Sequence, residues 1–172
     1  MCVSICGQIG YLVIASGALI MSFFSLFWPH WYTMNGKDYG FVSSACYDRT
    51  GDIGPDQCKA DIEHIFDRAD YNRTVVILMI VGIIITFFSI LWCLASFCAC
   101  CCRSHFLHVL PVFSVIAGVL FAAAVITFAA SYNHGGNPKL SDSFIIAACA
   151  SAVSFIAALM AGLTAYCSDR CA

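Results

Sequence analysis

Residues 74 to 97 read TVVILMIVGIIITFFSILWCLASF, an apolar run that contains no Asp, Glu, Lys or Arg. A helix of about 20 apolar residues crosses the roughly 30 Å hydrocarbon core of a bilayer. Runs of similar length and composition occupy positions 8–28, 107–131 and 143–166. The sequence therefore predicts an all-α membrane protein, with its 172 residues folded as one domain around a left-handed bundle of four transmembrane helices.

The overall composition also indicates a membrane protein, because 61% of the residues are hydrophobic and only 10% are charged. The four apolar runs contain no Asp, Glu, Lys or Arg, the usual marks of proton relays and ion-coupled transport sites, which disfavours a pump or a transporter. No Ser/His/Asp set, phosphate-binding loop or pair of buried carboxylates stands out in the rest of the sequence. We therefore expect membrane lipid around the protein, and no enzymatic activity, cofactor, metal ion or nucleic-acid partner.

Most of the charge lies in the connection between the first two runs, at positions 29–73. Eight of the ten acidic and five of the eight basic residues fall there, which gives this segment a formal net charge of −3. Four of the acids are candidates for a surface that faces a partner or a cation, because carboxylates lower the local cost of a cation. These four are Asp38, Asp48, Asp52 and Asp56. The alternative is that they form an ordinary solvated surface.

The same connection is predicted to fold as a small antiparallel sheet. Short aromatic and β-branched pieces occur at 31–34, 39–42 and 45–47, and the first two are separated by a segment that begins Asn35-Gly36, a strong hairpin signal. Apolar residues at helical spacing in 58–70 predict a short amphipathic helix before the second run. The connection at 132–142 is short and rich in turn residues.

The twelve cysteines divide into groups by position. Cys46 and Cys58 lie alone in the large connection, and a lone pair in a small extracellular module predicts a disulfide bond. In the chain-entropy model, closing this loop contributes roughly 3 kcal/mol. Cysteines at the other ends of the helices are candidates for S-palmitoylation: Cys98, Cys100, Cys101, Cys102, Cys167 and Cys171. One topology suits both groups, with both termini cytoplasmic and the connections 29–73 and 132–142 extracellular.

Two other interpretations of the cysteine run at 98–102 are weaker. Its CxxC spacing could indicate a thiol-disulfide enzyme, although such an enzyme also needs a thiol of lowered pKa and an acceptor site. Zinc binding would need a second pair of ligands at finger-like distance, which the sequence does not offer. A sequon at Asn72 is a candidate glycosylation site close to the predicted membrane edge.

Several residues together resemble the claudin-like superfamily, which includes claudins, peripheral myelin and lens-fibre tetraspan proteins, and stargazin-type channel subunits. Pro29-His30-Trp31 corresponds to the Pro-x-Trp with which the first helix of claudins leaves the membrane. Gly40-Phe41, followed by Cys46 and Cys58, corresponds to their Gly-Leu-Trp-x-x-Cys and second Cys, with Val42 where a Trp is expected. Arg73 near the second helix, the segment 117–120 and the pair 137–138 also match.

The resemblance implies a role for each of the matched residues. Trp31, Gly40 and the pair Cys46 and Cys58 become the structural signature of an extracellular sheet, and Arg73 becomes a candidate for pinning that sheet to the helix ends. An interfacial anchor in the lipid headgroup region is a second, compatible role for Trp31. The chain ends in Cys171-Ala172 and lacks the hydrophobic terminal motif by which many family members bind PDZ scaffolds.

The resemblance also implies two functions. The first is cell-cell adhesion with a paracellular barrier or channel, in which the extracellular sheet binds the same protein or other claudin-like proteins at a cell junction. The second is that of an auxiliary subunit, which binds and modulates an ion channel or receptor. In both cases the expected location is the plasma membrane.

Overall fold

The computed structural model of the chain describes residues 2–28, 31–34, 37–39, 70–98, 108–132, 139–140 and 142–170. It contains four long helices, α1 (Cys2–Phe27), α3 (Asp70–Cys98), α5 (Val109–Tyr132) and α6 (Asp142–Arg170). The segments that are long and apolar enough to cross a membrane are Ile5–Phe27, Arg73–Phe97, Val109–Ala130 and Asp142–Ser168. The prediction of four helices that are long and apolar enough to span a membrane is therefore confirmed.

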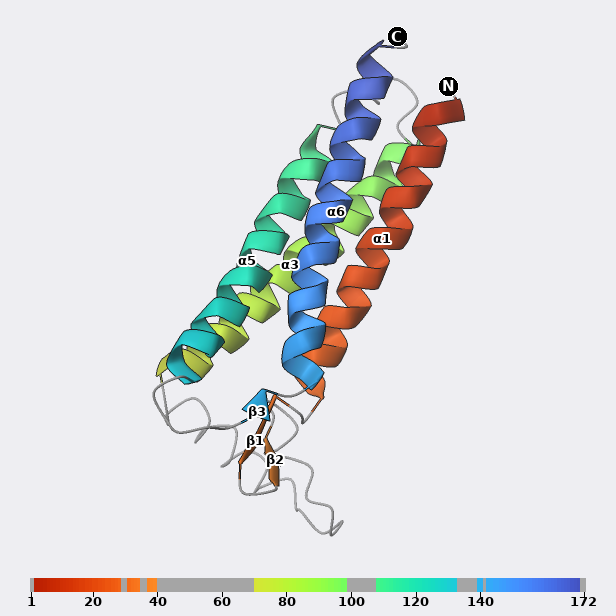
Figure 1. Cartoon of the computed structure of the whole chain (residues 1–172). Helices are drawn as coiled ribbons and strands as arrows, with labels where there is room; N and C mark the ends of the chain where they lie inside the picture. Colours follow the sequence, from red (N-terminus) through yellow and green to blue (C-terminus); the bar gives the residue numbers. More distant parts are fainter. Residues whose placement is uncertain are drawn as a thin grey trace.

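The four helices form an elongated bundle in which each helix packs against two neighbours (Figure 1). α1 packs on α6 and, less extensively, on α3, while α5 packs on both α3 and α6. The N-terminus and the C-terminus lie at one end of the bundle, and the short strands lie at the other end, called here the loop-side end (Figure 1). The handedness of the bundle stays a prediction.

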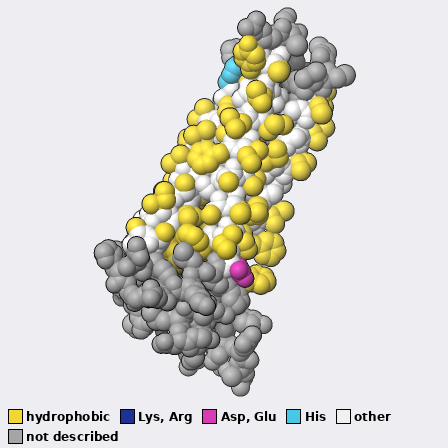
Figure 2. All heavy atoms as spheres, in the orientation of Figure 1, with side chains coloured by type: hydrophobic (Ala, Val, Ile, Leu, Met, Phe, Trp, Pro, Cys, Tyr) yellow, Lys and Arg dark blue, Asp and Glu magenta, His cyan; other side chains and the backbone are white. Residues whose placement is uncertain are grey.

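Small and hydroxyl-bearing side chains fill much of the interior, beside larger ones such as Met79, Phe121 and Phe128, and large apolar side chains cover the outside. Along α6 the buried side chains are small: Ser143, Ala147, Ala150, Ser151, Ser154, Ala157, Ala158, Ala161, Thr164 and Ala165. Ile126 and Leu159, by contrast, are 65% and 68% exposed, and apolar side chains cover the length of the visible face (Figure 2). A soluble monomer rarely exposes so large an apolar surface, so this arrangement fits a protein that lipid surrounds.

Gly82 and Gly118 are two of the glycines that lie where neighbouring helices approach closely. A Cβ atom added to Gly82 of α3 would lie 2.5 Å from Cε1 of Phe121 on α5. A Cβ atom added to Gly118 of α5 would lie 3.2 Å from the ring of Phe155 on α6. Close approach at small residues is the usual way for helices to associate where lipid provides no hydrophobic drive.

Three short strands lie at the loop-side end: β1 (Tyr32–Met34), β2 (Lys37–Tyr39) and β3 (Lys139–Leu140). β1 lies between the other two and pairs antiparallel with both. Met34 pairs with Lys37, so β2 begins two residues before the predicted strand at 39–42. This register leaves Asn35-Gly36 between the strands, the sequence that two-residue hairpin loops favour.

The strand β3 was not expected, because the segment 132–142 was predicted only as a turn-rich connection. The predicted strand at 45–47 and the predicted helix at 58–70 lie outside the described residues, apart from Asp70, with which α3 begins. The extracellular position of a larger, disulfide-bonded sheet stays a prediction.

Candidate functional site

The indole ring of Trp31 lies inside the protein at the loop-side end and is completely buried. Its Nε1 atom donates a hydrogen bond to the backbone carbonyl oxygen of Ser25 at 2.6 Å. The ring meets Phe128 of α5 edge-on, with 5.1 Å between the ring centroids. Edge-to-face contacts of this kind are favourable beyond the area that they bury. Trp31 therefore fixes the chain that leaves α1 against both α1 and α5.

The hydroxyl groups of two serines extend this contact to α6. Ser25 donates from Oγ to the carbonyl oxygen of Ser143 at 2.9 Å, and Ser143 donates from Oγ to the carbonyl oxygen of Trp28 at 3.4 Å. Ser25 and Ser143 are both fully buried. We call Ser25, Trp28, Trp31, Phe128 and Ser143 the loop-side anchor. It connects the end of α1, the start of α6 and the last turns of α5.

The loop-side anchor also positions the small sheet. β1 begins at Tyr32, the residue after Trp31, and β3 ends two residues before Asp142, where α6 begins. Tyr32 pairs with Leu140, so the two strands join directly beside the anchor. The sheet is therefore attached to the bundle through both of its connections to the helices.

The structure places some of the predicted site residues in its helices and strands. Asp38 is the middle residue of β2 and pairs with Thr33. Asn72 lies in the first turn of α3, and Arg73, which is exposed, begins the membrane-spanning segment of that helix. Cys98 is the last residue of α3, and Cys167 is exposed near the end of α6, so both lie at the end of the bundle that holds the termini.

The remaining predicted site residues lie outside the described part of the chain. They are Gly40, Cys46, Asp48, Asp52, Asp56, Cys58, Cys100, Cys101, Cys102 and Cys171. The disulfide bond, the acidic surface and the palmitoylation sites therefore stay predictions. Among the described residues, the structure brings together no group of three His, Cys, Asp or Glu side chains that could hold a metal ion.

A second polar site, which sequence reasoning missed, lies inside the bundle. Tyr11 of α1 is buried, and its hydroxyl group hydrogen-bonds to the hydroxyl groups of Ser89 on α3 and Ser114 on α5, the latter at 2.8 Å. Because Tyr11 is the one tyrosine within the first apolar run, its phenol was a possible signal of a buried polar contact. Nothing in the sequence connects Tyr11 with these two serines, which lie 78 and 103 residues away.

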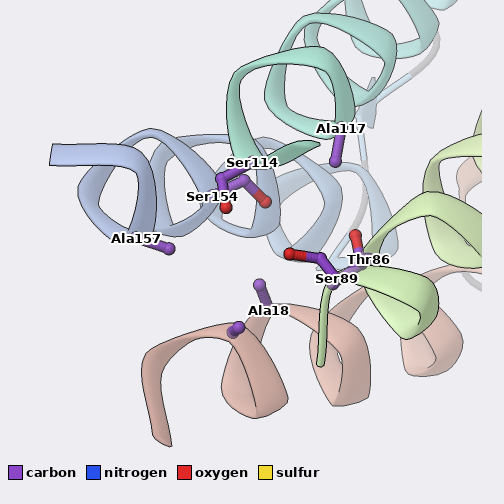
Figure 3. Close-up of a pocket in the computed structure, with 8 residues that line it drawn as sticks. Ala18, Thr86, Ser89, Ser114, Ala117, Ser154 and Ala157 are labelled. Carbon is purple, nitrogen blue, oxygen red and sulfur yellow. The ribbon is translucent and has the colours of Figure 1, made fainter. Parts of the chain in front are cut away.

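A cavity of about 10 Å³ lies beside these hydroxyl groups, and all four helices line it (Figure 3). The lining consists of small side chains only: Ala15, Ala18, Thr86, Ser89, Ser114, Ala117, Ser154 and Ala157. A third polar contact lies nearer the termini, where Gln8 donates from Nε2 to Oγ of Ser96 at 3.4 Å. Thus hydroxyl and amide groups connect α1 to α3 at two depths.

No protein-family model matches the chain, and no curated protein matches it either. The resemblance to the claudin-like superfamily therefore rests on the residues of this chain alone.

Proposed function

We propose that the protein is a claudin-like structural protein of the plasma membrane, which binds neighbouring proteins through its first connection, 29–73. In this proposal the termini are cytoplasmic, and the small sheet and the acidic residues around it face the extracellular space. The protein would mediate cell-cell adhesion and form a paracellular barrier or channel with other copies of itself or with other claudin-like proteins.

The observation that carries this proposal is the loop-side anchor. A surface that binds a partner has to be held in a fixed geometry, and sites supported by rigid elements are more precise than sites on free loops. The anchor ties β1 to three helices through the buried indole ring of Trp31 and the hydroxyl group of Ser25. Such an attachment suits a bundle whose task is to present its loops.

The interior of the bundle also agrees with a role in which the helices support the loops. The cavity at its centre has a volume of about 10 Å³, whereas sites for small-molecule ligands have about 300 to 1,000 Å³. Its lining consists of Ala, Ser and Thr and includes no ionisable side chain. These features favour a scaffold over a transport pathway or a catalytic pocket inside the described helices.

The experiment that tests the proposal uses two populations of non-adherent cells, of which one or both express the full chain. The adhesion hypothesis predicts that the protein gathers at contacts only where both cells express it. Mild-detergent purification should then yield polymers of the chain itself or junctional proteins. Even distribution along all cell borders, together with a monomeric purified protein, would contradict the proposal.

The second candidate is an auxiliary subunit of an ion channel or receptor. The observation that favours it is an exposed aromatic surface at the end of α1 and the residue after it, where Phe23 and Phe27 stack with their centroids 5.9 Å apart and Phe24 lies beside Trp28. Aromatic residues are enriched where proteins bind one another. Recovery of a stoichiometric channel or receptor from the same purification would establish this function in place of adhesion.

A further inference from the structure

The cavity inside the bundle has a regular construction. Each helix contributes two small residues spaced by three positions: Ala15 and Ala18, Thr86 and Ser89, Ser114 and Ala117, Ser154 and Ala157. Residues at this spacing lie on the same face of a helix, so all four helices direct their smallest side chains towards a common point. These eight side chains do not fill the space between them, and three helices place hydroxyl groups there (Figure 3).

The hydroxyl groups beside the cavity carry one more proton than the hydrogen bonds between them use. Tyr11, Ser89 and Ser114 carry three hydroxyl protons, but among the described residues their oxygen atoms form only two hydrogen bonds, one between Tyr11 and Ser89 and one between Tyr11 and Ser114. Whichever group donates in each bond, one hydroxyl proton is left without an acceptor. The three side chains are at most 6% exposed, so lipid and bulk water do not reach this proton. A buried donor without an acceptor is costly and therefore rare.

Two acceptors face the same cavity, one from α3 and one from α6. Thr86 donates from Oγ1 to the carbonyl oxygen of Gly82 at 2.8 Å, and Ser154 donates from Oγ to the carbonyl oxygen of Ala150 at 2.8 Å. Each proton is thus used within its own helix, while the lone pairs of each hydroxyl oxygen stay available. Both side chains line the cavity and are buried.

We propose that this cavity is a binding site for a single water molecule that connects Thr86 on α3 and Ser154 on α6 to the hydrogen-bonded trio of Tyr11, Ser89 and Ser114. The water accepts the remaining proton of the trio formed by Tyr11, Ser89 and Ser114, and it donates its own two protons to Oγ1 of Thr86 and Oγ of Ser154. Three hydrogen bonds are the usual number for a buried water, and about 10 to 15 Å³ is enough space for one. The volume of about 10 Å³ leaves no space for a larger ligand.

The direct test is a crystal structure of the full chain, grown in a lipid phase, at about 2 Å resolution, where ordered buried waters are visible. The expected result is a density peak within about 3 Å of Oγ1 of Thr86 and Oγ of Ser154, and of an oxygen of the trio. A map that shows ordered waters elsewhere but none between these groups overturns the proposal. This test needs no variant and does not depend on the function of the loops.

A double-mutant cycle in purified protein provides a second test. Thr86→Val and Ser154→Ala each remove one acceptor of the water, and the two side chains form no hydrogen bond with each other. A shared water makes their effects on the unfolding equilibrium non-additive by a factor of about two or more. Additive effects contradict the proposal.

The matched control is Ser22→Ala, combined with Thr86→Val in the same cycle. Ser22 is as buried as Ser154 and also donates to a carbonyl oxygen of its own helix, that of Leu19 at 2.9 Å, but it does not line the cavity. This control pair should be additive. Equal coupling in both cycles would show that the non-additivity does not come from the cavity, and would also overturn the proposal.

Discussion

Nε1 of Trp31 donates a hydrogen bond to the carbonyl oxygen of Ser25, six residues earlier, and this bond turns the chain back onto the helix that it has just left. The carbonyl oxygen of Ser25 lies in the last turns of α1, where carbonyl groups no longer have an amide partner in the helix. The indole N–H thus donates to a carbonyl oxygen at the end of the helix, while the indole ring is buried against Phe128.

Replacement of Trp31 should lower the free energy of unfolding, and replacement by Ala should lower it more than replacement by Phe. Trp31→Phe loses the hydrogen bond but keeps an aromatic ring against Phe128, and we expect a cost of about 1 kcal/mol. Trp31→Ala also leaves a cavity, and we expect about 3 to 5 kcal/mol. Chemical unfolding in detergent micelles or bilayer discs measures both.

The matched control for this prediction is Trp28→Phe. Trp28 lies three residues before Trp31, and its side chain is 48% exposed, so its loss should change the free energy of unfolding by at most about 0.5 kcal/mol. If Trp28→Phe lowered the free energy of unfolding as much as Trp31→Phe, the buried position of Trp31 would not explain its contribution to stability.

Gly82→Ala should destabilise the packing of α3 on α5. Its Cβ atom would lie 2.5 Å from Cε1 of Phe121, and such overpacking costs about 1 to 3 kcal/mol. Gly17→Ala is the control, because nothing lies within 4 Å of its Cβ position, and it should leave stability unchanged or improve it. Adding Phe121→Leu to Gly82→Ala should cost less than the two single changes together, and full additivity would contradict the clash.

Tyr11→Phe should lower the free energy of unfolding by about 0.6 kcal/mol, the average measured for hydrogen bonds between membrane helices, and by no more than about 1.7 kcal/mol, the largest value measured. The change removes the hydroxyl group that connects Ser89 to Ser114 and leaves the ring in place. Ser22→Ala serves as the control, since that hydroxyl bonds only within α1. The prediction is wrong if both variants unfold at the same denaturant concentration.

The predicted disulfide bond is tested by surface expression. Cys46→Ala, Cys58→Ala and the double variant should all lose surface protein to the same extent, because either single change already removes the bond and its roughly 3 kcal/mol. Flow cytometry of intact cells measures the surface fraction. Losses that add up from the single variants to the double variant would indicate two independent thiols.

The predicted palmitoylation is tested by acyl exchange. Replacement of Cys98, Cys100, Cys101 and Cys102 by Ser should abolish the labelling of a fragment that contains the segment 98–102. Cys149→Ser is the control: this cysteine is exposed near the start of α6, at the opposite end of the bundle, so its loss should leave labelling unchanged. Unchanged labelling after the fourfold replacement would exclude acylation of this run.

The sequence predicted the four helices well, because length and the absence of charge identify a membrane span without any knowledge of its neighbours. It could not predict which face of a helix points inwards. In α3, Met79 is fully buried and Ile80 is 41% exposed, although both are large and apolar, since lipid and protein interior favour the same side chains. Only the positions of small and hydroxyl-bearing residues carry that information.

Contacts between distant residues could likewise not be predicted from the sequence. Trp31 was identified from its place in a motif, but nothing in the motif indicates that its ring meets Phe128 or that its Nε1 atom bonds to Ser25. The hairpin of β1 and β2 was recognisable because Asn35-Gly36 determines a local turn. The pairing of β1 with β3 joins residues more than 100 positions apart and leaves no local pattern.

That last pairing determines how the loops of this protein can be exchanged. β1 belongs to the first connection and β3 to the second, yet Tyr32 and Thr33 pair with Leu140 and Lys139 in one ladder. In a chimera that receives a foreign segment 29–73 alone, the foreign first strand would have to pair with β3 of the original second connection. The register between these two strands would no longer match. The two connections therefore have to be transplanted together, although α3 and α5 separate them in the chain.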